Sequence, residues 1–190
     1  MFDNEGRKES FKMSNHVRTV VKFHKLKKDD IDIVLNLIAT CSRSPRKPEG
    51  EYFIDFNKII PEPTTIEECP EDCRVKSAKE AHITEDETRP WFNWYEWHVK
   101  YWGTKWGAYD CYTVIGKSFI QFVFSTAWSL AHPVIQKLAL MGYNIEIRYA
   151  DEDIGSNCGK LTYTSEQGWT HWDESELKDP VRFAREVWKH

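Results

Sequence analysis

The feature that most constrains this chain is an aromatic stretch between residues 88 and 109, which holds five of its nine tryptophans. Pro90 suits the first turn of a helix, where an amide hydrogen has no partner. Gly103 suits the left-handed backbone position at which helices often end. We therefore expect a helix that begins near Pro90 and ends at Gly103.

The aromatic side chains of this expected helix form two rows. The first row repeats at intervals of three and four residues and consists of Trp91, Trp94, Tyr95, His98 and Trp102. The second row, Trp97 and Tyr101, lies on a neighbouring face. One helix face cannot hold both rows. Either the helix is wedged between two packed layers, or the second row lines a pocket or a partner surface.

Length and composition favour a single domain. The chain has 190 residues, and 41% of them are hydrophobic, which is ordinary for one globular core. A net charge of −4 gives no overall attraction to nucleic-acid phosphates or to an anionic membrane, although it leaves room for a local basic patch.

The distribution of apolar residues and cysteines points to the cytoplasm. No apolar run approaches the roughly 18 residues that a membrane span needs, and residues 1–12 lack the apolar centre of a signal peptide. The five cysteines are odd in number and irregularly spaced, as in a reducing compartment. We expect a cytoplasmic protein without membrane contact.

Hydrophobic periodicity predicts an alternation of strands and helices after a flexible segment at residues 1–13. The expected strands are residues 16–24, 51–60, 106–115, 119–125, 143–149 and 160–164. The expected helices are residues 29–41, the aromatic helix, a helix from about residue 132 to Gly142, and one that begins at Asp179-Pro180. Residues 42–50 are expected to form a basic loop, either solvated or in contact with an anion, and residues 64–87 an acidic loop with one short helix. This order favours one α+β domain over residues 14–190.

The aromatic segment also carries a resemblance. Trp94-Tyr95-x-Trp97, followed by the run from Trp102 to Trp106, is similar to the signature of the YubB-type ferredoxin-like family. Residues 15–17, 54–63 and 151–159 resemble the same family. The resemblance implies a ferredoxin-like fold, with a largely antiparallel sheet and helices packed on it. It also implies an origin in a plasmid or bacteriophage, and it supplies no catalytic residues.

The motifs that could carry chemistry are weak. Cys69 and Cys73 would need two further ligands to hold zinc, and only His82 lies nearby. The segment after Asp151 has oxygen donors for a hard cation, but its spacing differs from that of a calcium loop and also suits a hydrogen-bonded turn. His132 suits a helix cap better than catalysis. No enzyme motif is present, and we expect no catalytic residue, no metal and no cofactor.

The leading hypothesis is therefore a non-enzymatic binding domain. Aromatic rings next to basic side chains suit a small anionic ligand of the nucleotide type, because the rings stack on a base and the cations pair with a phosphate. The candidate ligand-binding residues are Trp97, Tyr101, Lys105, Trp106, Arg148 and Lys160. The mobile-element setting that the resemblance implies suggests a host-interaction or counter-defence role.

Three alternatives remain open. Exposed tryptophan and tyrosine residues also form protein-protein hot spots, so the chain could be an adaptor for a host protein. Binding of single-stranded nucleic acid is less favoured because of the net charge. An uncharacterised enzyme could assemble its site from residues distant in sequence.

Overall fold

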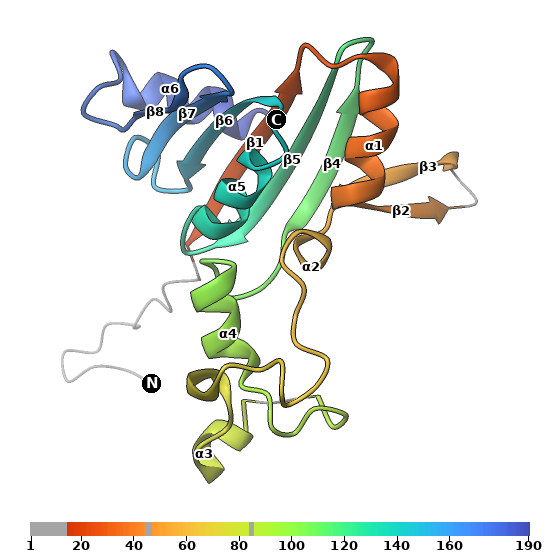
Figure 1. Cartoon of the computed structure of the whole chain (residues 1–190). Coiled ribbons are helices and arrows are strands. Elements are labelled where there is room, and N and C mark those ends of the chain that lie inside the picture. The colour runs from red at the N-terminus through yellow and green to blue at the C-terminus, as the bar shows by residue number, and fades with distance from the viewer. Residues whose placement is uncertain (1–14, 45–46, 84–85) are drawn as a thin grey trace, which may run out of the picture.

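The computed structural model describes residues 15–44, 47–83 and 86–190 (Figure 1). The expected flexible segment at residues 1–13 lies outside this part of the chain. The main element is a six-stranded sheet in which every neighbouring pair is antiparallel, in the order β4-β5-β1-β6-β7-β8. Its strands are β1 (His16–His24), β4 (Tyr109–Ile115), β5 (Phe119–Ala127), β6 (Asn144–Asp151), β7 (Cys158–Thr164) and β8 (Gly168–Trp172).

The main core lies on one face of this sheet. Alternate residues of β1, including Val17, Val21 and Phe23, are fully buried there, as the period-two pattern predicts. Two helices cover this face, α1 (Lys28–Ile38) and α5 (His132–Ala139). Helix α1 ends at Ile38 rather than at residue 41, because Ala39 already has an extended backbone and begins the next strand.

The order of these elements defines the fold. Strand β1 and helix α1 are followed, after a long insertion, by the β4-β5 hairpin, α5 and β6. In the sheet these strands lie in the order β4-β5-β1-β6, so that β1 sits between two strands that come later in the chain. This is the split arrangement of ferredoxin-like folds. The expected α+β class with a largely antiparallel sheet is confirmed.

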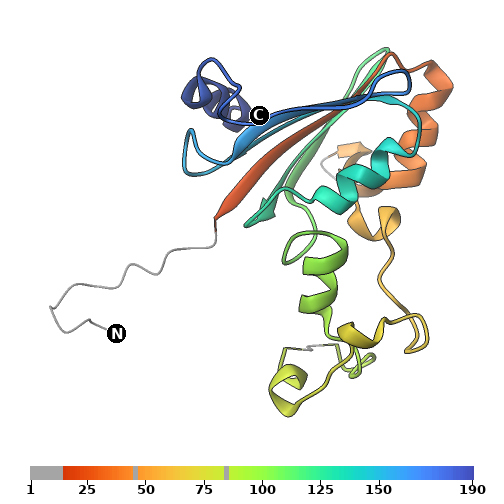
Figure 2. The ribbon, with the colours of Figure 1, turned by 60° about the vertical axis from the view of Figure 1, so that its left-hand side comes forward.

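The opposite face of the sheet carries a second, smaller core. Helix α6 (Pro180–Trp188) packs there through Ala184 and Val187, against Val20 and Val123 of the central strands. Asp179 caps this helix by accepting a hydrogen bond from the Arg182 amide at 2.9 Å, as expected. Figure 2 shows α6 on one side of the sheet, with α1 and α5 on the other.

Most of the insertion between α1 and β4 extends below the sheet, while its first part lies beside α1 (Figure 1). The insertion contains the hairpin β2 (Ala39–Ser44) and β3 (Lys47–Ile54), helices α2 (Phe56–Ile59), α3 (Ala78–Ala81) and α4 (Trp94–Tyr101), and the 3-10 turn η1 (Glu71–Cys73). The hairpin is a separate two-stranded sheet.

Three expectations about elements were wrong. Residues 42–50 are not a loop, since the described residues on both sides of positions 45–46 belong to paired strands. The expected strand 51–60 ends at Ile54, because the Asp55 carboxylate accepts a hydrogen bond from the Asn57 amide at 3.0 Å and caps α2. Residues 168–172, which lie outside all the expected strands and helices, form the edge strand β8.

The aromatic helix α4 is shorter than expected. It starts at Trp94, because Asn93 rather than a residue near Pro90 provides the cap, accepting a hydrogen bond from the Glu96 amide at 3.2 Å. It ends as predicted: Gly103 has the left-handed backbone conformation, with φ +78°. The amides of Trp102 and Gly103 both donate to the His98 carbonyl.

Candidate functional site

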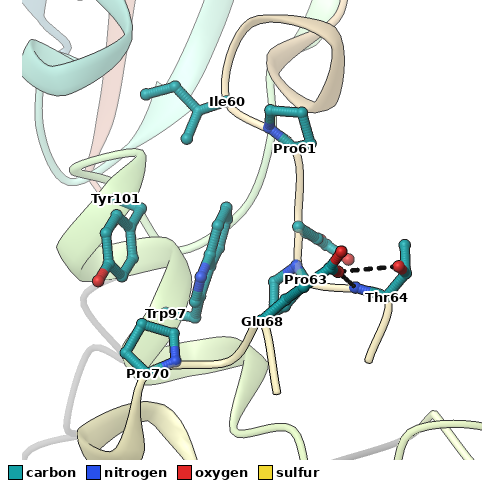
Figure 3. A pocket seen from close by; sticks show the side chains of 9 residues that line it. Ile60, Pro61, Pro63, Thr64, Glu68, Pro70, Trp97 and Tyr101 are labelled. Atoms are coloured by element: carbon teal, nitrogen blue, oxygen red, sulfur yellow. Dashed lines mark hydrogen bonds between the residues drawn. The ribbon is translucent and has the colours of Figure 1, made fainter. Parts of the chain in front are cut away.

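A crevice of about 500 Å³ lies between α4 and the segment that follows α2 (Figure 3). Its aromatic side is formed by two residues of α4, and its other side by the chain from Ile60 to Pro70. The lining residues are Ile60, Pro61, Glu62, Pro63, Thr64, Glu68, Pro70, Trp97 and Tyr101. The volume is typical of small-molecule sites.

Trp97 and Tyr101 form the aromatic wall of the crevice. They stand four residues apart on α4, so their rings meet, with centroids 5.0 Å apart and planes inclined by 27°. Trp97 is only 4% exposed and also packs edge-on against Phe92 and Trp102. The second aromatic row therefore lines a pocket, and at Trp97 it is part of the packed interior as well.

The facing wall is held in place by hydrogen bonds. The Glu68 carboxylate accepts from the Thr64 amide at 2.8 Å and from the Thr64 hydroxyl at 2.9 Å. The Glu62 amide donates to the Asn57 side chain at 2.7 Å. The Pro63 carbonyl accepts from Arg89 at 3.1 Å. Because side chains of Asn57, Glu68 and Arg89 hold its backbone, this wall is preorganised for binding.

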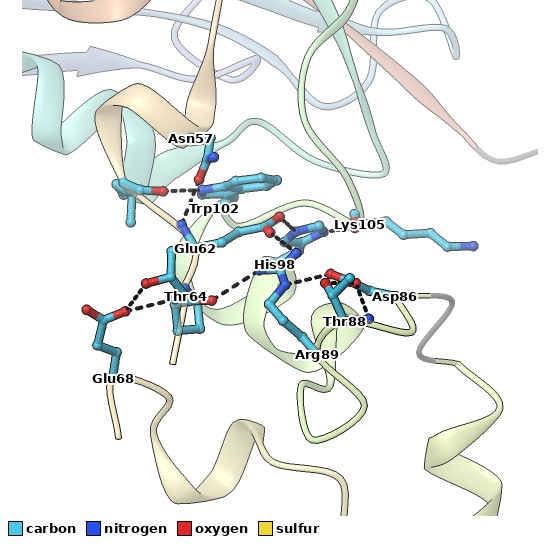
Figure 4. Close-up of polar contacts among 12 residues, drawn as sticks. Asn57, Glu62, Thr64, Glu68, Asp86, Thr88, Arg89, His98, Trp102 and Lys105 are labelled. Atoms are coloured by element: carbon cyan, nitrogen blue, oxygen red, sulfur yellow. Dashed lines mark hydrogen bonds and ion pairs between the residues drawn. The ribbon is translucent and has the colours of Figure 1, made fainter. Parts of the chain in front are cut away.

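Glu62 ties the two sides of the crevice together (Figure 4). Its Oε1 lies 2.6 Å from His98 Nε2, and its Oε2 lies 2.8 Å from Arg89 Nη2. The hydrogen bond from His98 and the one from Arg89 hold the pKa of Glu62 below its ordinary value, against the effect of burial. His98 also points Nδ1 at the Lys105 carbonyl, 3.0 Å away. Both ring nitrogens of His98 therefore face acceptor oxygens.

The basic residues next to the crevice are already paired with acids. Arg89 contacts Asp86 at 2.6 Å as well as Glu62, and the hydrogen bonds from Thr88 and Arg89 lower the pKa of Asp86 to about 2. Lys100 contacts Asp72 at 2.6 Å. Among the lining residues, all of which are described, the carboxylates Glu62 and Glu68 are the charged groups. The crevice therefore suits a neutral or positively charged group better than a phosphate.

The structure separates the six candidate ligand-binding residues into three pairs. Trp97 and Tyr101 line the crevice. Lys105 and Trp106 follow α4 and contact each other, with the Lys105 ammonium 4.7 Å from the Trp106 ring centroid. Arg148 and Lys160 lie opposite each other on β6 and β7. The cations expected to complete an aromatic nucleotide pocket are therefore not among the residues that line it.

The Lys105 pair belongs to an exposed aromatic patch that includes Trp128. The Lys105 ammonium also lies 5.3 Å from the Trp128 ring, which in turn packs edge-on against Tyr95. Trp106 is 36% exposed and Trp128 41% exposed. Trp128 has φ +73°, a conformation that is unusual for a bulky side chain and tends to occur at functional sites.

Sequence reasoning missed Glu62, Arg89 and Trp128. Glu62 carries the clearest available signal, because a carboxylate between Pro61 and Pro63 sits on a stiff, extended segment and has a fixed direction. Arg89 and Trp128 have no comparable signal. The contact of Arg89 with Glu62 and that of Trp128 with Lys105 join residues distant in sequence.

The remaining motifs are integrated into the fold. Cys69 and Cys73 are buried, and burial raises the pKa of both thiols. Asp151 accepts hydrogen bonds from the Asp153 amide and the Asn157 side chain. The segment after Asp151 therefore forms a hydrogen-bonded turn, one of its two expected structures. In the described part of the chain, no group of three or more histidine, cysteine and acidic side chains is arranged to hold a metal ion.

No helix within the described residues combines the length and the apolar character that crossing a bilayer requires.

Comparison with known proteins supports the fold. Residues 101–187 match the family model described as a ferredoxin-like domain in Api92-like protein. The match runs from the last residue of α4 through β4 to α6 and leaves out β1 and most of the crevice. No curated protein and no solved structure matches the chain.

Proposed function

We propose that the protein is a non-enzymatic binding domain whose crevice holds a flat ring, such as a nucleobase, in a neutral or positively charged ligand. The observation that carries this proposal is the stacked pair of Trp97 and Tyr101 facing a wall of prolines and carboxylates. Stacking of a base on an aromatic side chain contributes about 1–3 kcal/mol and does not depend on base identity.

The carboxylates that line the crevice favour a nucleoside over a nucleotide as its ligand. Glu62 and Glu68 line the crevice, while the neighbouring Lys100 and Arg89 are engaged with acids. A phosphate inside the crevice would meet like charges in a partly desolvated site. The ligand that fits is a base or nucleoside, or a nucleotide whose phosphate points away from the crevice into solvent.

The setting of this activity is a further part of the proposal. The resemblance to YubB-type proteins supports an origin in a plasmid or bacteriophage and work in the bacterial cytoplasm. In that setting, sequestering a base-containing host signal would serve host interaction or counter-defence. The ferredoxin-like fold itself is compatible with many functions and does not select among them.

Tryptophan fluorescence tests the proposal directly, because Trp97 lines the crevice. The four common nucleosides, the matching nucleotides and cyclic nucleotides are titrated against the protein. We expect saturable quenching, with a nucleoside bound more tightly than its nucleotide. Tyr101→Ala should weaken binding about tenfold or more. The control is Tyr95→Ala on the same helix, since Tyr95 packs against Trp94 and Trp128 and does not line the crevice.

Two results would count against the crevice. One is equal weakening by Tyr101→Ala and Tyr95→Ala. The other is tighter binding of every nucleotide than of its nucleoside, which would place the ligand at cations elsewhere on the molecule.

A protein-protein adaptor is the second candidate, because the patch of Trp106, Lys105 and Trp128 has the composition of an interface hot spot. We expect the variant with both Trp106→Ala and Trp128→Ala to lose a host protein that co-purifies with the wild type, while Tyr101→Ala keeps it. Retention of that protein by the double variant would contradict the adaptor function of this patch.

A further inference from the structure

On the sheet face against which α6 packs, the part that adjoins the C-terminal end of α6 carries a set of basic side chains, and Arg148 Nη2 lies 3.5 Å from His190 Nε2. Arg148 on β6 lies directly opposite Lys160 on β7, and Lys160 lies opposite Trp172 on β8. Lys22 on β1 is opposite Glu146 on β6, one step further along the strands. Because side chains directly opposite each other share a sheet face, these residues form one continuous surface.

This surface is locally basic although the chain has a net charge of −4. Its central strands contribute three cations, Lys22, Arg148 and Lys160, against one acid. That acid, Glu146, lies 2.9 Å from Lys160 and 3.8 Å from Arg148. Lys22 places its ammonium 4.6 Å from the Phe119 ring centroid, and within the described residues no carboxylate forms an ion pair with it.

The charged groups of this surface also shift the pKa of the neighbouring His24. Burial lowers the pKa of His24, which lies on β1 next to this surface. Lys25, Lys22 and Lys160 lower it further, while Glu146 opposes them. The cations therefore act together at this end of the sheet.

Trp172 adds a stacking element at the edge of the basic surface. It is 36% exposed, and the Lys160 ammonium lies 5.9 Å from its ring centroid. A row of cations that ends at an exposed aromatic ring is the combination that single-stranded nucleic acids use, because phosphates pair with the cations and a base stacks on the ring.

The geometry points to the basic surface made of Lys22, Arg148, Lys160 and Trp172 as a binding site for single-stranded nucleic acid. The surface lies on the opposite side of the sheet from the core that contains Trp97 and Trp102. It is separate from the crevice, so either site can be tested without the other. It also accounts for Arg148 and Lys160, which the crevice does not use.

The direct test is fluorescence anisotropy of end-labelled oligothymidine and oligouridine of about 12 nucleotides, a length within the usual site sizes. Binding is measured over a series of salt concentrations. Three phosphate contacts predict that log K falls with log salt with a slope of about −2. Absence of saturable binding at low salt would overturn the inference.

Matched variants locate the surface. Arg148→Gln combined with Lys160→Gln should reduce the magnitude of the salt slope by about 1.4, because two phosphate contacts are lost. The control combines Lys79→Gln and Lys137→Gln, two exposed lysines on α3 and α5. An equal reduction in both double variants would show a diffuse charge effect and overturn the inference.

Trp172 has a control on its own strand. Trp169 is equally exposed at 37%, but it packs against Tyr163 on the opposite face of the sheet. We expect Trp172→Ala to weaken strand binding about tenfold and Trp169→Ala to leave it unchanged. Circular dichroism verifies that both variants are folded. Equal effects of the two substitutions, or none from Trp172→Ala, would overturn strand binding at this face.

Discussion

Two glycines with the same backbone conformation differ in what surrounds them. Gly103, after α4, and Gly142, after α5, both have φ +78°. A Cβ at Gly103 would lie 2.7 Å from Pro133 Cδ and 3.3 Å from the His132 amide nitrogen, whereas a Cβ at Gly142 would have no atom within 4 Å. Gly103 therefore allows the end of α4 to contact the start of α5.

This difference gives a prediction at the residue scale. Gly142→Ala should cost about 1 kcal/mol of unfolding free energy, since the left-handed conformation disfavours any Cβ. Gly103→Ala should cost a further 1–3 kcal/mol or so, because the methyl group overpacks against Pro133. Urea denaturation of both variants measures the difference. Equal losses would mean that α4 and α5 separate without cost.

Individual residues show how far sequence alone can go. Gly103 could be predicted because a helix end has a local signature in the chain. The contact of Glu62 with His98 joins residues 36 positions apart and has no local signature. The same limit applies to the candidate site: Trp97 and Tyr101 were predictable as neighbours from helical spacing, while the placement of Arg148 and Lys160 on another surface depends on the fold.

At the scale of elements, Trp102 at the end of α4 contacts several other parts of the molecule. Its ring is 5% exposed, lies parallel to the His98 ring at 4.0 Å, and meets Phe56 edge-on at 5.9 Å. Its Nε1 donates to the Ile60 carbonyl at 2.9 Å, at the start of the proline wall. One side chain thus connects α4, α2 and the crevice.

Trp102→Ala should therefore cost about 3–5 kcal/mol, the usual range for removing a buried large aromatic side chain. Trp106→Ala, four residues later, should cost less than 1 kcal/mol because that ring is largely outside the core. Chemical denaturation followed by circular dichroism compares the two. A loss at Trp102 as small as that at Trp106 would contradict the anchoring of α4.

The elements that sequence reasoning missed share a physical cause. Strand β8 is an edge strand whose residues are mostly exposed, and its sequence lacks the alternation of apolar and polar residues that identified β1. Helix α2 is a single turn of four residues, which is too short for a helical period to show. Strand β2 and the first part of β3, which pair with each other, lie around two prolines and several basic residues, a composition that favoured a loop.

At the scale of the whole molecule, carboxylates hold separate segments together. One joins two segments of the insertion, and another joins neighbouring strands of the sheet. Glu62 contacts His98 and Arg89 in the insertion, and Glu146 contacts Lys160 across β6 and β7. The pKa of Glu62 is lowered first by the hydrogen bond from His98. Burial raises the pKa of Glu146, but the hydrogen bond from Lys160 and the charges of Lys160, Arg148 and His24 together hold it below the ordinary value.

These shifts fix the direction of the pH dependence. A carboxylate with a lower pKa in the folded state binds protons more readily when the chain is unfolded, so acid favours unfolding. Its stabilising contribution is complete above the ordinary glutamate value of 4.5 and is lost as the pH falls through the folded-state value. We expect the free energy of unfolding to vary little for this reason between pH 7 and about pH 5.5 and to decline below pH 4.5.

The Glu62→Gln variant isolates the contribution of Glu62 to this pH dependence of the unfolding free energy. The variant should lose about 1.5–3 kcal/mol at pH 7, the usual contribution of hydrogen bonds to a charged group. It should also decline less than the wild type between pH 5 and pH 3, since glutamine does not titrate. Glu67→Gln, an exposed position in the same segment, is the control and should follow the wild-type curve. If Glu62→Gln followed that curve too, the contacts of Glu62 with His98 and Arg89 would not stabilise the folded chain, and the crevice would lack the rigid wall on which its proposed binding depends.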